Sequence, residues 1–355
     1  METPAHCNLA CPYCYACGGQ IERPDRLLTE AQYMAILGEA AHLGVDSLGI
    51  PGAGEPFIDR NLPLTMAIIR RASELGMFVT VFSTGEFITR ELAGELLHQP
   101  VEIMLKGNTL DETEQDRFVS DPARGRIVSG YGRKRNAAIK LLMELGFNDP
   151  NNPIAKAFGR ESRMALVTSI LASSEASGPN NLGDLAKLLR FCRENNIIFD
   201  CDSVLERGRA IDCKLRLQGE AIKVIQQNLQ AIDRTEFARE WDLSQSYVGT
   251  TCDRNKHHLY LSQYGAIRPC IGAMDVSLGD IHESDTLESA WNSQAMQIIR
   301  GRCYGGVCGT QCANFAEGSC NSCLGRRAVN LTAESLCEKG FVDTVGCWNF
   351  RPKEE

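Results

Sequence analysis

Three cysteines near the start of the chain carry the strongest chemical signal. Cys7, Cys11 and Cys14 stand at C-x3-C-x2-C spacing. A [4Fe-4S] cube normally takes four cysteine thiolates, so a tight set of three predicts a cluster with one iron open to a ligand that is not protein. The alternative is a zinc knuckle, because closely spaced cysteines also suit tetrahedral zinc. No fourth ligand stands at zinc-finger spacing, which favours the cluster.

A second motif, Gly52-Ala-Gly-Glu-Pro56, follows the short apolar run Leu48–Ile50. Glycines let the backbone approach a ligand closely, and the amides and carbonyls of such a turn can hold a zwitterionic amino acid head group. We expect Gly52, Gly54, Glu55 and Pro56 to contribute to this binding. Taken alone, the motif is also compatible with an ordinary turn.

Together the two motifs resemble the signature of the radical S-adenosylmethionine (radical SAM) enzymes, including an aromatic residue, Tyr13, directly before the last cysteine. The resemblance implies that Tyr13 lies at the cofactor site and that the open iron chelates SAM. It also implies that Gly52–Pro56 binds the methionine amino group, and that a 5′-deoxyadenosyl radical abstracts a substrate hydrogen. One departure is that only Met1–His6 precede Cys7. The first strand is therefore expected to be short or missing, with no leader-peptide module before it.

A second group of cysteines lies in the last third of the chain, where Cys252, Gly265 and Cys270 show C-x12-G-x4-C spacing. This pattern resembles the SPASM extension of radical SAM enzymes, which implies two auxiliary [4Fe-4S] clusters. The later cysteines depart from the usual order. One cluster is assigned Cys252, Cys270 and Cys323, completed by Cys303 or Cys347 or left open, and the other Cys308, Cys312, Cys320 and Cys337. A structural zinc or iron–sulfur ribbon is the alternative.

Composition limits the class of protein. The chain has 355 residues, is 43% hydrophobic and carries a net charge of -8, so a nucleic acid is not expected as a partner. We find no apolar run of about 18 residues and no signal peptide, which predicts a cytoplasmic protein without a membrane span. Sixteen cysteines in a reducing compartment indicate metal binding rather than disulfides.

The elements that must position these motifs alternate between strand and helix patterns, which predicts a parallel sheet. We expect an α/β fold: a partial (β/α)6 TIM-like barrel over residues 1–215, a helical connector over 216–250 and a small cysteine-rich auxiliary-cluster domain over 251–355. Strands are predicted at Leu48–Ile50, Met77–Ser83, Val101–Leu105, Ala165–Ala172 and Ile197–Cys201, and helices at Thr29–Leu43, Leu62–Leu75, Phe87–Leu97, Asn136–Leu145, Leu182–Glu194 and Ala221–Ile232.

Polar residues at the predicted strand ends are candidates for substrate contact, because active sites of such barrels lie at the carboxyl ends of the strands. Lys106, Asp202 and Glu206 are the candidate catalytic side chains, and Ser83 is expected to face SAM. Cys201 could return a hydrogen atom in an epimerase. The alternatives are loop charges and helix caps for the polar residues, and a buried structural role for Cys201.

Two arginines follow the last predicted strand, in Leu205-Glu-Arg-Gly-Arg-Ala210. This segment resembles the turn after the sixth strand of radical SAM enzymes. Arg207, together with Arg209, is a candidate to receive the SAM carboxylate or an anionic substrate. Ion pairs with nearby acids are the alternative.

Auxiliary clusters can accept an electron, which favours dehydrogenation, cross-linking or epimerisation. In similar enzymes that oxidise a serine or cysteine side chain, an acidic residue follows the G-x4-C cysteine, whereas Ile271 stands here. The sequence therefore predicts oxidation or epimerisation of a carbohydrate-like or aminocyclitol-like small molecule in natural-product biosynthesis, with a flavodoxin-type or ferredoxin-type reductant. The alternatives are radical modification of a peptide or protein side chain, and a non-catalytic iron–sulfur electron-transfer protein.

Overall fold

The computed structural model describes residues 1–173, 178–205, 207–211, 215, 219–241, 254–301, 313, 333–334 and 352–353. Its contacts divide the chain into two compact units, Met1–Arg216 and Leu217–Glu355, and each is described by itself.

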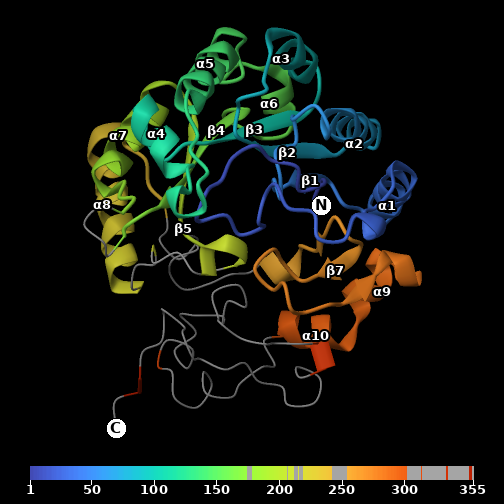
Figure 1. The fold of residues 1–355 in the computed structure, drawn as a ribbon. Helices are drawn as coiled ribbons and strands as arrows, with labels where there is room; N and C mark the ends of the chain where they lie inside the picture. Colours follow the sequence, from blue (N-terminus) through green and yellow to red (C-terminus); the bar gives the residue numbers. More distant parts are fainter. Residues whose placement is uncertain are drawn as a thin grey trace. The chain divides into compact units, whose positions relative to one another are not determined.

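The first unit is built on one parallel sheet of five strands in the order β1-β2-β3-β4-β5. The strands are β1 (Ser47–Ile50), β2 (Phe78–Ser83), β3 (Val101–Lys106), β4 (Met164–Ile170) and β5 (Ile198–Ser203). Figure 1 shows helices arranged in an arc outside the sheet. The predicted partial α/β barrel is confirmed with five strands rather than six.

The segment before the first cysteine, residues 1–6, forms no strand of its own. It is nevertheless tied to the fold, because the Met1 ammonium donates to the Gly49 carbonyl at 2.9 Å and the Tyr33 hydroxyl donates to the Glu2 carbonyl at 2.8 Å. Thr3 and Ala5 are fully buried. The place of the expected first strand is therefore taken by a segment that pairs with no strand and is held by single hydrogen bonds.

The helices of this unit follow the predicted alternation. They are α1 (Glu30–His42), α2 (Leu62–Glu74), α3 (Arg90–Leu97), α4 (Glu112–Phe118), α5 (Tyr131–Glu144), α6 (Pro153–Ala157) and α7 (Leu182–Glu194). Thr29 caps α1, since its hydroxyl accepts from the Gln32 amide, as expected for a side-chain N-cap. The short helices α4 and α6 were not predicted, because seven and five residues give too little periodicity to detect.

The two faces of the sheet differ in composition because side chains alternate along a strand. On β3, Val101, Ile103 and Leu105 are fully buried and point outward to the helices. Glu102, Met104 and Lys106 occupy the other face, which lines the inside of the arc. The apolar core of the unit thus lies between sheet and helices, and the inside is left for polar groups.

The second unit contains α8 (Gly219–Phe237), a small antiparallel sheet and two helices, α9 (Leu287–Asn292) and α10 (Gln294–Gly301). The sheet consists of β6 (Tyr260–Leu261), β7 (Ala266–Arg268) and β8 (Gly279–Asp280). Gly265 permits the tight β6–β7 turn with its positive φ of 87°. In neither unit is a described helix long and apolar enough to cross a membrane.

Candidate functional site

The three cysteines of the first motif lie on one loop, residues 7–19, and Gly18 brings two of them together. A Cβ at Gly18 would lie 3.3 Å from Cβ of Cys7 and 3.6 Å from Sγ of Cys14, and the Gly18 amide donates to that Sγ at 3.2 Å. Cys7 and Cys11 pack against a common apolar cluster of Leu9, Val119 and Tyr131. The loop therefore gathers the thiols at the inside of the arc.

The electrostatics of these thiols indicate what they can hold. The pKa of Cys7 and of Cys11 is raised to about 12, mainly by burial and to a smaller extent by the charge of neighbouring cysteines. Thiolates so placed require a cationic centre to form. No three His, Cys, Asp or Glu side chains in the described part of the chain converge on a single ion. An iron–sulfur cluster fits this donor set better than one zinc ion, because the ligands of a cluster bind separate irons.

The Gly52–Pro56 turn packs against His6, which directly precedes the cysteine loop. The Glu55 amide donates to the His6 carbonyl at 2.8 Å, and Gly54 packs so closely on His6 that a Cβ would overlap its backbone. Gly52 has a φ of 71° and passes the Phe82 carbonyl, 3.0 Å from where a Cβ would lie. The glycines of this motif are therefore required by close backbone packing, which holds the turn beside the cysteines.

The Glu55 side chain is buried and forms hydrogen bonds within the protein. Its Oε1 accepts from the Ser83 hydroxyl at 2.7 Å and from the Phe57 amide at 3.1 Å, and its Oε2 accepts from the Thr84 amide at 2.6 Å. Glu55 is fully buried, and burial raises its carboxyl pKa while these donors lower it. Both Glu55 and Ser83, which we expected at the cofactor, are thus joined to each other.

Tyr13 is held from the opposite side of the loop by a network that the sequence analysis missed. The Asn108 amide nitrogen donates to the Tyr13 hydroxyl at 2.6 Å, while its oxygen accepts from the Ser169 amide at 3.0 Å. The Asn181 side chain donates to the Asn108 carbonyl at 3.1 Å. Asn108 lies two residues after the end of β3, so a search for polar residues near strand ends, which selected Lys106, would also have found it.

A polar cluster lies on the inner face of the sheet. Lys106 donates from Nζ to the Ser169 hydroxyl at 3.2 Å, and strand pairing places Asp200 opposite Val167 and Asp202 opposite Ser169. Burial lowers the pKa of Lys106, and the charges of Asp200 and Asp202 oppose that shift. Cys11 and Cys14 also act on this amine, so the cluster lies near the cysteine loop. The structure thus brings Lys106 and Asp202 together.

Cys201 lies between these two aspartates along β5 and therefore points to the other face of the sheet. It pairs with Thr168, which is buried on the helix side. Burial raises the Cys201 pKa well above its ordinary range. This location separates Cys201 from the inner polar cluster.

The arginine turn reaches the cysteine loop through Gly208, whose φ is 55° and whose Cα packs onto the carbonyls of Cys14 and Tyr15. Arg209 is only 8% exposed, and its charge lowers the pKa of Cys7 and Cys11. Within the described residues its Nε has no hydrogen-bond partner. Arg207, the predicted ligand of the carboxylate, is half-buried. Arg209 is therefore the arginine of this turn that acts most directly on the cysteines.

Of the second cysteine group, the described residues include Cys270. Cys270 packs half-buried against Ala273, Val276 and Ile299 in the second unit. The other cysteines assigned to the auxiliary clusters lie outside the described residues, namely Cys252, Cys303, Cys308, Cys312, Cys320, Cys323, Cys337 and Cys347. The candidate catalytic residue Glu206 also lies outside them. The assignment of the cysteines to individual clusters stays a prediction.

Comparison with protein families gives two matches. Residues 4–120 match a 4Fe-4S single cluster domain, and residues 252–324 match the SPASM iron–sulfur cluster-binding domain. The chain therefore contains two iron–sulfur cluster-binding regions and resembles radical SAM enzymes that carry a SPASM domain. Its cofactors are accordingly [4Fe-4S] clusters and SAM. The cysteine loop and the Gly52–Pro56 turn both lie inside the first matched region.

Individual relatives cover parts of the chain. The PqqA peptide cyclase of Granulibacter bethesdensis is 28% identical over 146 residues, which is 41% of this chain and 36% of that protein. The Fe-coproporphyrin III synthase of Methanosarcina barkeri is 34% identical over 151 residues, 41% of this chain and 35% of that protein. The chain thus matches little more than a third of the length of either relative.

Among solved structures, SuiB of Streptococcus suis bound to S-adenosylmethionine superposes with a TM-score of 0.63. It shares 17% sequence identity, and the match covers 98% of this chain and 76% of SuiB. The superposition shows that this chain and SuiB share the same fold.

Proposed function

We propose that this protein abstracts a hydrogen atom from a peptide substrate bound inside the barrel. The observation that carries the proposal is the inner polar cluster of Lys106, Ser169, Asp200 and Asp202 beside the cysteine loop. A cation and two carboxylates on one apolar-walled face can bind the charged and amide groups of a peptide. A peptide substrate has more support than the expected carbohydrate or aminocyclitol substrate, because similar proteins act on or bind peptides.

The names of two of the similar proteins or structures mention a peptide. One is the PqqA peptide cyclase, and the other is SuiB, whose structure bound to precursor peptide SuiA superposes on this chain with a TM-score of 0.60 and 18% identity. These likenesses favour the alternative prediction, modification of a peptide side chain, over a small molecule. The dehydrogenase or epimerase type remains without support from them.

Several residues would hold the cofactors. Cys7, Cys11 and Cys14 would ligate the cluster, and the backbone of Gly52–Gly54 would receive the SAM head group. When bound, these groups supply the radical that takes a hydrogen atom from the substrate. Glu55 fixes the turn through its three donors, so its role is positioning.

The remaining residues act on the substrate. Lys106 would donate hydrogen bonds from Nζ to a peptide carbonyl or carboxylate, and Asp202 would accept from an amide or ammonium group. Both are largely removed from water, which strengthens such bonds. Cys201 has no part in this scheme, because it faces the helices.

The test is a deuterium-transfer experiment on reconstituted full-length protein. A small peptide encoded beside the gene is prepared in perdeuterated form and incubated with SAM and dithionite. Deuterium is expected in the 5′-deoxyadenosine, as measured by mass spectrometry. Turnover of aminocyclitols or sugars with unlabelled 5′-deoxyadenosine in every peptide reaction would overturn the peptide assignment. A complete lack of 5′-deoxyadenosine with any substrate would overturn the activity itself.

A further inference from the structure

One surface segment near the cysteine loop has a charge opposite to that of the whole chain. Residues 122–134, called here the basic loop, contain Arg124, Arg126, Arg133 and Lys134 and no acidic residue, whereas the chain as a whole carries -8. The segment joins the short 3-10 turn Pro122–Arg124 to the start of α5. The proposed reaction uses none of these side chains.

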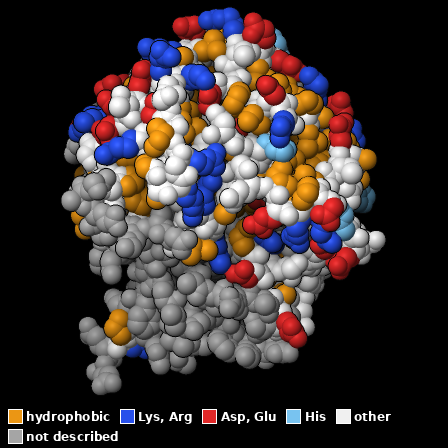
Figure 2. Space-filling view, viewed as in Figure 1, with side chains coloured by type: hydrophobic (Ala, Val, Ile, Leu, Met, Phe, Trp, Pro, Cys, Tyr) orange, Lys and Arg blue, Asp and Glu red, His pale blue; other side chains and the backbone are white. Residues whose placement is uncertain are grey.

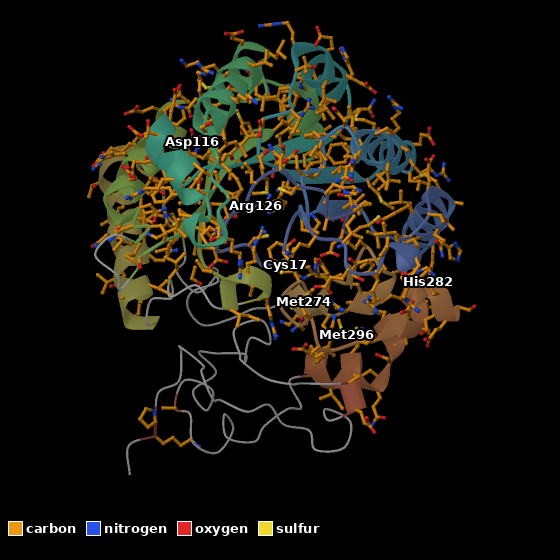
Figure 3. All side chains as sticks on the ribbon, viewed as in Figure 1. Cys17, Asp116, Arg126, Met274, His282 and Met296 are labelled. Carbon is orange, nitrogen blue, oxygen red and sulfur yellow. The ribbon has the colours of Figure 1, made fainter. Side chains whose placement is uncertain are left out.

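The basic loop presents both charge and an apolar side chain to solvent. Ile127 is 70% exposed, more than any other large hydrophobic residue that the structure describes. Arg124 pairs with Asp121 at 3.3 Å and Lys134 with Glu86 at 2.6 Å. Figure 2 shows a compact group of Lys and Arg atoms near the middle of the viewed face, in the region where Figure 3 labels Arg126.

Two of the arginines are available for a partner. Arg126 and Arg133 are exposed, and within the described part of the chain neither has an ion-pair partner. An exposed isoleucine between unpaired arginines is a small apolar contact surrounded by positive charge. Such a surface fits an acidic protein that binds briefly, because weak electron-transfer complexes use small interfaces and electrostatic steering.

The basic loop also contacts the loop that would hold the cluster. Val128 packs on the apolar cluster that includes Cys7 and Cys11, next to Ile127 in the chain. Arg126 reaches the other end of the cysteine loop, since its Nη1 lies 3.9 Å from where a Cβ of Gly19 would stand. Val128 and the two cluster ligands thus pack on the same three apolar side chains, Leu9, Val119 and Tyr131, so the surface at Ile127 is joined to the cysteine loop through this cluster.

We propose that the basic loop is the docking surface for an acidic one-electron donor protein. The proposal rests on the proposed function, because only a redox cluster at Cys7, Cys11 and Cys14 needs such a donor. One electron passes from the reduced donor to the cluster, the donor is oxidised by one electron, and no bond forms or breaks. An acidic peptide substrate is the competing occupant, but Val128 of the basic loop packs on the same apolar cluster as Cys7 and Cys11, which favours the electron donor.

The test compares two donors of electrons to the cluster-loaded full-length protein. The charge-reversal variant R126E/R133E is matched with K156E/K187E, which makes the same change in net charge at exposed lysines of α6 and α7. Stopped-flow spectroscopy follows cluster bleaching by a reduced flavodoxin or by dithionite. Calorimetry measures association of oxidised flavodoxin at low and high salt.

R126E/R133E is expected to slow reduction by flavodoxin about tenfold or more at low salt and to flatten its salt dependence. Reduction by dithionite and both rates of K156E/K187E should stay at the wild-type value. I127D should weaken flavodoxin association without altering the dithionite rate.

Three results would overturn the proposal. The first is a rate of cluster reduction by flavodoxin in R126E/R133E that equals the wild-type rate. The second is an equally large slowing of this rate in the control variant K156E/K187E. Equal loss with both reductants would mean that the loop acts on the cluster or on the substrate, including an acidic peptide. A wild-type protein that is reduced by flavodoxin but cleaves no SAM would refute the proposed function alone, since cluster bleaching would still measure docking.

Discussion

The two faces of the five-stranded sheet use alternate residues of the same strands for different purposes. On β3 the outward residues Val101, Ile103 and Leu105 are fully buried against helices, whereas the inward residues Glu102 and Lys106 are charged. The outer face supplies apolar burial, and the inner face supplies ligands and charge near the cysteines. Substitutions on the outer face should therefore change mainly stability, and substitutions on the inner face mainly activity. Pairs of residues, one from each face, can test this difference.

The largest expected effect compares two cysteines. Cys11→Ala removes an inner ligand and should abolish both SAM cleavage and the iron of this cluster, leaving only iron bound elsewhere. Cys192→Ala changes a fully buried cysteine of α7 on the helix side and should keep the iron content. Iron analysis and 5′-deoxyadenosine assays check this, and equal iron loss in both variants would remove the distinction.

The next effect compares Leu105 with Met104. Leu105→Ala leaves a cavity in the outer core and should lower the free energy of unfolding by about 2–5 kcal/mol. Met104→Ala, at a half-buried inner position, should cost clearly less. Urea unfolding of the apo proteins measures both values. A larger loss for Met104→Ala would contradict the assignment of the core to the outer face.

Lys106→Met should lower turnover on the inner face by about 100-fold while leaving the fold intact. Burial already disfavours the charged amine, so the apolar replacement is expected to keep or raise stability. Substrate-dependent formation of 5′-deoxyadenosine measures the loss of turnover, and thermal unfolding measures the stability. Full turnover in Lys106→Met would exclude this residue from the site.

The smallest effect is a pH dependence at Glu102. Burial raises its pKa above the ordinary 4.5, so the folded state retains this proton at higher pH than the unfolded state. Its contribution to stability is complete below the unfolded pKa and is lost as pH rises through the folded pKa. Glu102→Gln should remove that loss, so its stability relative to wild type should increase between pH 4 and pH 8. The free energy of unfolding of both proteins is measured by urea denaturation across this pH range. A constant difference between wild type and Glu102→Gln would contradict the prediction.

The sequence predicted the five strands and the parallel sheet because these depend on the alternation of strand and helix patterns along the chain. It could not predict which face of β5 lines the interior. Ile198 and Phe199 are both apolar, so either parity satisfies the pattern, and only pairing of Asp200 with Val167 of β4 decides it. Cys201 was therefore considered beside Asp202, from whose face the pairing separates it.

The hydrogen-bond partners of Glu55 could not be predicted from its own motif either. Its motif predicts a ligand-binding carboxylate, but the Ser83 hydroxyl and the Thr84 amide occupy both oxygens. These donors lie 28 and 29 residues further along the chain. Such partners follow from the packing of β1 against β2, which spacing within a motif does not encode.

The contact of Gly208 with the carbonyls of Cys14 and Tyr15 has a consequence for biosynthesis. The wall of the cysteine loop is completed by a turn that is translated almost two hundred residues later. At about 5–20 residues per second, the ribosome needs roughly 10–40 s to reach it. During that interval the nascent thiols lack one wall of their pocket, so iron–sulfur delivery to this loop should follow completion of the first unit rather than emergence of its first residues.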